Sequence, residues 1–166
     1  MRKTIVGMFV SLLPLLLPVG AAADAGKEVR VEEGVYRTIS PAELSAMLRA
    51  KDFFLVDVHV PYAGEIPKTD AFISYEDTAV RIGDYPPDKA ARVVVYCLGN
   101  RMSGIAVREL LKMGYTNVSM LDGGMNGWRA AGFPLIHRDR PPPVAYPSGS
   151  SEPAPPAPKT CGCSVE

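Results

Sequence analysis

The chain of 166 residues lacks the features that mark several large functional classes. Basic and acidic residues number 18 each, so there is no basic surplus to attract nucleic acid or an anionic membrane surface. Two histidines, His59 and His137, are too few for a histidine-based metal centre. We therefore expect no nucleic-acid partner and no bound cofactor.

The sequence also lacks an apolar run long enough to cross a bilayer. Its longest apolar stretch, residues 5–19, contains two prolines and is shorter than the roughly twenty residues that a transmembrane helix needs. Two basic residues precede this stretch, and the small residues of segment 20–25 follow it. That order is typical of a secretory signal. We expect residues 1–23 to be a signal peptide, so that the mature protein is periplasmic or secreted and not inserted in a membrane.

Cysteine is scarce, with three residues in the chain: Cys97, Cys161 and Cys163. The last two are separated by a single glycine near the C-terminus. An odd number of cysteines in an exported protein indicates a free thiol or an intermolecular bond. If Cys161 and Cys163 pair locally, Cys97 is the free thiol.

Proline, by contrast, is concentrated in one segment. Eight of the twenty residues in segment 141–160 are proline, a composition that cannot bury a core and indicates an extended, solvated linker. The predicted organisation is a signal peptide (1–23), an N-terminal extension (24–35), a folded domain (36–138) and a disordered Pro-rich tail ending in Cys-Gly-Cys (139–166).

Strand and helix patterns alternate within the predicted domain. Residues 40–43, Ser-Pro-Ala-Glu, form a capping box that predicts a helix to residue 50. Further helices are predicted over 103–113 and around Trp128, and strands over 53–58, 71–73, 92–96 and 117–121. The alternation predicts an α/β fold with a mainly parallel central sheet flanked by helices on both faces.

Cys97 follows the strongest predicted strand and comes just before a helix. Ligands of parallel sheets collect at this end of the strands. The loop that follows contains Leu98, Gly99, Asn100, Arg101, Met102 and Ser103. Its glycine and asparagine allow positive φ angles that would turn N–H groups inward, and the helix start adds unpaired N–H groups. The loop is therefore a predicted anion site that favours a thiolate, with Arg101 as its cation. Alternatively, Cys97 is a small buried residue that ends a core strand.

The span 39–135 resembles a rhodanese-like domain. The resemblance is carried by Ile-Ser-Pro-Ala-Glu-Leu at 39–44, Leu-Val-Asp-Val at 55–58, Val-Tyr-Cys at 95–97 with its loop, and Leu-Asp-Gly-Gly-Met-Asn-Gly-Trp at 121–128. It implies a rhodanese-like fold and a sulfurtransferase activity. Cys97 would take sulfur from a donor such as thiosulfate or a persulfide, hold it as a persulfide stabilised by loop amides, and pass it to a thiol or cyanide.

Two departures from the family pattern leave the donor open. Many members have arginine where this chain has His59, and Gly-His-Ile-Pro where it has Gly-Glu-Ile-Pro at 64–67. The loop length also excludes two related chemistries. Cysteine phosphatases place five residues between cysteine and arginine, whereas three separate Cys97 from Arg101 and Ser103 stands at the sixth position. Arsenate reduction of the related type is excluded by the same spacing.

Four further residues have open roles. Asp57 would orient the loop or Arg101, or cap a turn. His59 would tune the site as a titrating group, or lie on the surface as an ordinary histidine. Cys161 and Cys163 would act as a redox pair, resolve the Cys97 persulfide, bind a soft metal such as copper(I), or form an inert disulfide.

The sequence favours an exported sulfurtransferase that uses a small sulfur donor and a thiol or cyanide acceptor. One alternative is a sulfur-binding, anion-binding or carrier module without catalysis, because one fold serves many functions. Another is a metal-binding or thiol-redox protein that acts through its C-terminal cysteines.

Overall fold

The computed structural model describes residues 26–139. The predicted signal peptide, the Pro-rich segment 141–160 and both C-terminal cysteines lie outside the described residues. Across 26–139, no helix is long and apolar enough to cross a membrane. The elements, in chain order, are β1 (Lys27–Val31), β2 (Gly34–Ile39), α1 (Pro41–Met47), η1 (Leu48–Ala50), β3 (Phe54–Asp57), β4 (Ala71–Phe72), η2 (Tyr75–Asp77), η3 (Ile82–Asp84), β5 (Val93–Tyr96), α2 (Arg101–Lys112), β6 (Val118–Leu121) and α3 (Gly124–Ala130).

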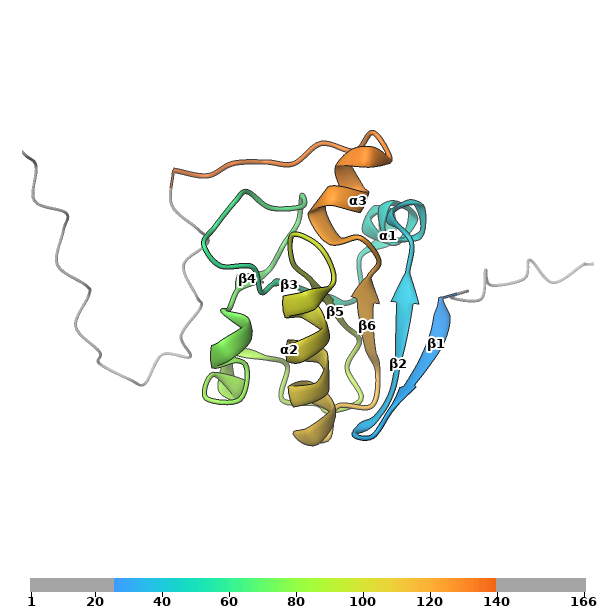
Figure 1. The fold of residues 1–166 in the computed structure, drawn as a ribbon, viewed down its shortest axis with the longest axis vertical. Coiled ribbons are helices and arrows are strands. Elements are labelled where there is room, and N and C mark those ends of the chain that lie inside the picture. Colours follow the sequence, from blue (N-terminus) through green and yellow to red (C-terminus); the bar gives the residue numbers. More distant parts are fainter. Residues whose placement is uncertain (1–25, 140–166) are drawn as a thin grey trace, which may run out of the picture.

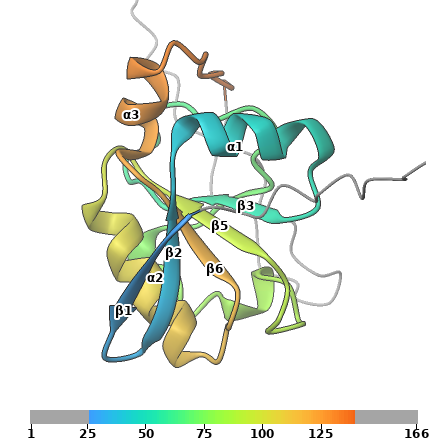
Figure 2. The same ribbon diagram turned by 90° about the vertical axis from the view of Figure 1, so that its right-hand side faces the viewer.

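One six-stranded sheet organises the domain, with strand order β1-β2-β6-β5-β3-β4. Every neighbouring pair is parallel except β1 and β2. Figure 1 shows α2 in front of the sheet, and Figure 2 shows α1 and α3 near one end of it. The predicted fold class, a mainly parallel sheet with helices on both faces, is confirmed.

Two apolar cores lie on opposite faces of the sheet. Residues of α2 pack with Val93 and Val95 of β5, whereas residues of α1 and α3 pack with Val94 and Tyr96 of the same strand. Successive side chains of a strand point to opposite faces, so β5 needs apolar residues at every position. All four of its residues are buried.

The predicted helices are confirmed with shifted bounds. The capping box of α1 is formed, because Ser40 N donates to Glu43 Oε2 at 2.6 Å and Glu43 N donates to Ser40 Oγ at 3.2 Å. Helix α2 begins two residues earlier than predicted, at Arg101, and Gly114 follows its end with a φ of +88°.

The sheet begins before the predicted domain start at residue 36. Segment 24–35 was expected to be an extension, yet it contains β1, which pairs with β2 in an antiparallel hairpin. The strand reads Lys-Glu-Val-Arg-Val, and its charged side chains are exposed while Val29 and Val31 are half-buried. A strand at the edge of a sheet can carry this many charges because little of it is covered.

Candidate functional site

The Cys97 thiol lies at the carboxyl end of β5, between that strand and the start of α2, as predicted. Its side chain is 2% exposed and packs in the core on the α2 face of the sheet. The thiol donates to Ser103 Oγ at 3.4 Å, and Ser103 Oγ donates to the carbonyl oxygen of Asn100 at 3.2 Å. Cys97 is therefore buried, as the structural alternative proposed, but it is also hydrogen-bonded to a hydroxyl in the first turn of α2.

The turn between β6 and α3 holds the loop after Cys97 in place. Met125 N donates to the carbonyl oxygen of Cys97 at 2.8 Å, and Asn126 N donates to that of Leu98 at 3.0 Å. A Cβ atom on Gly124 would overlap the carbonyl oxygens of Cys97 and Gly99. Only glycine allows this close backbone contact, which gives the Asp-Gly-Gly motif at 122–124 a physical reason.

The Asn100 side chain forms a second link between these two segments. Its Oδ1 accepts from Gly123 N at 2.8 Å, and its Nδ2 donates to Asp122 Oδ1 at 2.9 Å. The expectation of positive φ angles in the loop is wrong, because Asn100 has a φ of −120° and Gly99 is not among the left-handed residues. The left-handed residues are Gly123 and Gly124, at +71° and +54°, in the opposing turn.

Arg101 is not held against the thiol. It is exposed as the first residue of α2, and no hydrogen bond or ion pair within residues 26–139 joins it to Cys97. Its side chain instead lines a shallow surface hollow together with Tyr36, Gly104, Ile105 and Arg108. The residue predicted as the cation of the site therefore belongs to the outer face of α2.

Asp57 and His59 form a buried turn that contacts the start of α2. Asp57 Oδ1 accepts from His59 N at 2.9 Å, so the turn-capping role is the observed one, while its Oδ2 has no hydrogen-bond partner. The expectation of a surface His59 is wrong, because this side chain is 9% exposed and its Nδ1 lies 3.3 Å from Met102 Sδ. Burial raises the pKa of Asp57 to about 7 and lowers the pKa of His59, which favours a neutral imidazole.

Two buried residues near these elements were not predicted as part of the site. Tyr96, the residue before Cys97, accepts from Ile66 N at 3.1 Å and exchanges a 2.7 Å hydrogen bond with the Thr69 hydroxyl. Glu65 is 1% exposed, and its Oε1 lies 2.7 Å from the guanidinium of Arg138. The only sequence signal was glutamate at a family histidine position, which does not identify a partner so distant in the chain.

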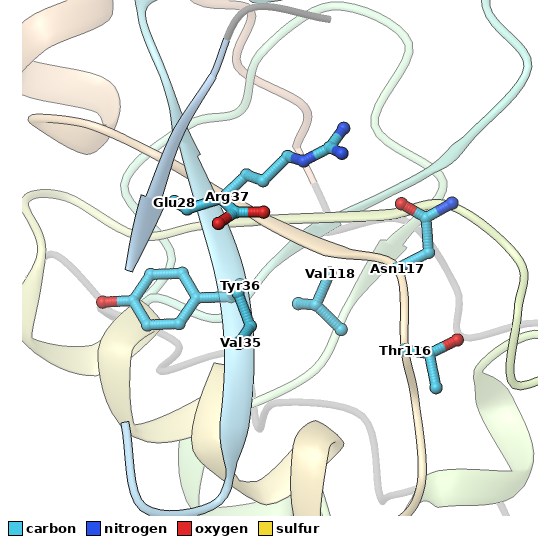
Figure 3. Close-up of a pocket in the computed structure, with 7 residues that line it drawn as sticks. All are labelled: Glu28, Val35, Tyr36, Arg37, Thr116, Asn117 and Val118. Carbon is cyan, nitrogen blue, oxygen red and sulfur yellow. The ribbon is translucent and has the colours of Figure 1, made fainter. Parts of the chain in front are cut away.

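The described part of the chain offers no evident metal site, since no group of three or more His, Cys, Asp or Glu side chains within 26–139 could hold an ion. A polar hollow lies elsewhere, beside β2 and at the start of β6 (Figure 3). Because β5 and β6 are parallel, the start of β6 is at the opposite end of the sheet from Cys97.

Comparison with known proteins agrees with this geometry. The model of the rhodanese-like domain family matches residues 40–131, more than half of the chain and all of the Cys97 site. The chain belongs to the rhodanese-like family. Members of this family use sulfur donors and thiol acceptors.

Two relatives of this rhodanese-like protein are sulfurtransferases by name. Thiosulfate:glutathione sulfurtransferase of Saccharomyces cerevisiae is 32% identical over 79 residues, which cover 45% of this chain and 57% of the yeast protein. A sulfurtransferase of Allochromatium vinosum is 32% identical over 90 residues, covering 52% of this chain and 80% of that protein. The chain therefore spans little more than half the length of the yeast relative.

A solved structure supports the fold. The solution structure of the rhodanese-like domain from an Anabaena sp. protein has a TM-score of 0.55 and 24% identity, covering 72% of this chain and 95% of that domain. At this identity the similarity shows the fold alone.

Proposed function

We propose that this protein is a sulfurtransferase that carries sulfane sulfur as a persulfide on Cys97. The observation that carries the proposal is the placement of the Cys97 thiol, hydrogen-bonded to Ser103 at the start of a helix of 12 residues. Unpaired N–H groups at a helix start attract negative charge, and both a thiolate and a persulfide are negative. The family match supports the same chemistry.

The reaction with thiosulfate has two balanced steps. The Cys97 thiolate attacks the outer sulfur of thiosulfate, which forms a sulfur–sulfur bond on the protein and releases sulfite. An acceptor thiolate or cyanide then attacks the outer sulfur of the persulfide, and Cys97 leaves as a thiolate. Throughout these steps the Ser103 hydroxyl can turn its proton toward the negative sulfur, because a hydroxyl both donates and accepts.

Cys97→Ser is the direct test. Serine is close in size to cysteine, so we expect little change in melting temperature, but its oxygen cannot carry sulfane sulfur. Mass spectrometry after incubation with thiosulfate or a small persulfide should find one added sulfur on the peptide that contains Cys97, and none in the variant. A Cys161→Ser/Cys163→Ser variant should still gain the sulfur on Cys97. Sulfur added elsewhere in Cys97→Ser would show that Cys97 is not the carrier.

A carrier module without turnover is the second candidate, and one observation favours it. The thiol is almost fully buried, and its hydrogen bond within residues 26–139 is to the neutral hydroxyl of Ser103, not to Arg101. Such a module would accept sulfur from a neutral persulfide but use thiosulfate poorly. Steady release of sulfite from thiosulfate in the presence of cyanide would support the enzyme, whereas a single loading event without turnover would support the carrier.

A further inference from the structure

The outer face of α2 presents two arginines with an apolar residue between them. Arg101, Ile105 and Arg108 are spaced by four and three residues, so they lie along one face of the helix. All three are exposed, and Ile105 is 41% exposed despite its apolar side chain. Tyr36 of β2 completes the hollow that they line. We call these four residues the α2 stripe.

The two arginines of the α2 stripe have no direct ion-pair partner among the described residues. Within residues 26–139, neither Arg101 nor Arg108 forms a hydrogen bond or an ion pair. Nearby acidic side chains have other partners. Glu109 is paired with Lys112 at 2.7 Å, and Glu76 accepts from Tyr75 at 2.8 Å. The stripe therefore combines two positive charges that form no ion pair within residues 26–139 with exposed apolar surface, although the whole chain has a net charge of zero.

The stripe starts at the Cys97 loop, since Arg101 follows Cys97 by four residues. From Arg101 to Arg108 the helix advances about 10 Å, at roughly 1.5 Å per residue. An extended peptide covers that length in about three residues, at roughly 3.3 Å each. Leu98, which is 36% exposed, adds apolar surface at the end nearest Cys97. A peptide whose cysteine reaches the Cys97 loop would thus place its next few residues over the arginines.

We propose that the α2 stripe docks the acceptor of the sulfur, and that this acceptor is an extended acidic segment of a protein with a reactive cysteine. The positive charge of the stripe favours carboxylates of a protein acceptor, and its exposed apolar residue provides contact area. The proposal rests on the sulfurtransferase function and names its acceptor class. In the transfer step, the acceptor thiolate attacks the outer sulfur of the Cys97 persulfide. A sulfur–sulfur bond forms on the acceptor, the one to Cys97 breaks, and Cys97 leaves as a thiolate.

The test compares two synthetic acceptors, a cysteine flanked on both sides by two glutamates and the same peptide with glutamines. The full chain carrying Cys161→Ser/Cys163→Ser is loaded with thiosulfate, freed of excess donor, and mixed with each peptide. The quantity measured is the transfer rate to the glutamate peptide divided by the transfer rate to the glutamine peptide. Comparing this ratio between protein variants cancels the intrinsic difference in thiol reactivity between the peptides.

We expect Arg108→Glu to lower this ratio by at least about fivefold, because electrostatic attraction raises association rates by an order of magnitude or more. Arg108→Gln should lower it less. At about 1 M salt, where charges are screened within about 3 Å, the ratios should converge. Arg129→Glu, which reverses an exposed arginine on α3, is the matched control and should leave the ratio unchanged.

An unchanged ratio in Arg108→Glu, or an equal fall in Arg129→Glu, would overturn the docking proposal while the sulfur-transfer function stands. If neither thiosulfate nor a small persulfide adds sulfur to Cys97 in the parent protein, the function itself is refuted.

Discussion

At the residue scale, the described part of the chain buries two carboxyl groups with different surroundings. Glu65 Oε1 lies 2.7 Å from the guanidinium of Arg138, whereas Asp57 forms no ion pair within residues 26–139 and its Oδ2 has no hydrogen-bond partner. Burial raises the pKa of Asp57 to about 7, against the opposing hydrogen bond from His59 N, and the negative charge of Glu65 raises it further. An unfolded aspartate titrates near pH 4, so Asp57 links folding to proton uptake.

We predict that Asp57 makes the protein less stable as pH rises. Between about pH 4 and pH 7 the folded state holds a proton that the unfolded chain has released, so each pH unit costs about 1.4 kcal/mol. Asparagine has no such proton. The free energy of unfolding should therefore fall between pH 5 and pH 8 by about 2–3 kcal/mol more in the parent protein than in Asp57→Asn. Urea titrations at the two pH values measure this difference, and equal falls would contradict it.

The sequence correctly predicted the surroundings of those site residues whose contacts are with residues close to them in the chain. Cys97 and Ser103 were correctly predicted to lie close together, because a strand end followed by a helix start fixes their local geometry, although Ser103 belongs to the first turn of α2 and not to the loop. Arg101 was predicted as the cation of the site, but no hydrogen bond within residues 26–139 joins it to Cys97 and it lines a hollow on α2. A loop sequence does not specify which way an exposed side chain turns. The partners of Glu65 and Tyr96 depend on distant segments, which spacing along the chain does not reveal.

At the element scale, the turn between β6 and α3 determines the shape of the Cys97 loop. We predict that Gly124→Ala destabilises the fold by about 2–4 kcal/mol, because the new methyl group would overlap two carbonyl oxygens and Gly124 has a φ of +54°. Sulfur loading on Cys97 should also slow, since the loop must shift. Urea unfolding and the loading rate measure the two effects.

Gly104→Ala is the matched control for stability. Gly104 lies inside α2 with an ordinary backbone conformation, and a methyl group added there would meet no atom within 4 Å. Alanine should stabilise the helix there by about 0.5–1 kcal/mol. If both substitutions had the same small effect, the close contact at Gly124 would not constrain the loop.

Elements marked by a strong local sequence signal were predicted well, whereas the charged strand β1 was not. The buried run of β5 and the capping box of α1 each follow from local chemistry. Strand β1 was missed because its charges resemble a solvated extension and its pairing with β2 supplies the order.

At the scale of the whole molecule, the chain after the family match remains part of the fold. The backbone of Glu65 exchanges two 2.8 Å hydrogen bonds with that of Ile136, beyond the family match at 40–131. Figure 1 shows this segment running from α3 across the end of the sheet toward the β4 side. Arg138 links this segment to the rest of the domain through its ion pair with Glu65. The Tyr62 hydroxyl also donates to Glu65 Oε2, at 3.3 Å.

We predict that Arg138→Gln destabilises the protein by about 1–2 kcal/mol, because it leaves the buried Glu65 carboxylate without its cation. This predicted destabilisation is smaller than that expected for a fully buried ion pair, because the Arg138 side chain is 43% exposed. Glu65→Gln combined with Arg138→Gln should recover part of the loss. Arg30→Gln is the control, because its pair with Glu28 is exposed, and it should change the urea midpoint very little. A double variant less stable than Arg138→Gln would contradict this account.

Cys161 and Cys163 form a potential dithiol near the C-terminus, outside the described residues. About twenty residues separate Arg140 from Cys161, and a chain of that length can extend about 60 Å at roughly 3.1 Å per residue. We therefore expect the linker to be long enough for the dithiol to react with the Cys97 persulfide of the same molecule. The Cys161 thiolate would attack the outer sulfur of the Cys97 persulfide, and Cys97 would leave as a thiolate. The Cys163 thiolate would then attack the sulfur atom of Cys161 and release the outer sulfur as sulfide. The two tail thiols would be oxidised to a disulfide as the sulfane sulfur is reduced.

Sulfide release after a single loading of Cys97 in the reduced protein, freed of reductant, measures this step. We expect release from the full chain to be faster than from Cys161→Ser/Cys163→Ser and to be independent of protein concentration, because the reaction is intramolecular. The competing outcome is that the pair oxidises at once in an oxidising compartment and stays inert. Equal release from both proteins would exclude the tail from turnover and favour soft-metal binding or an inert disulfide. Copper(I) uptake that survives Cys97→Ser but is lost in the double tail variant would then separate those two roles.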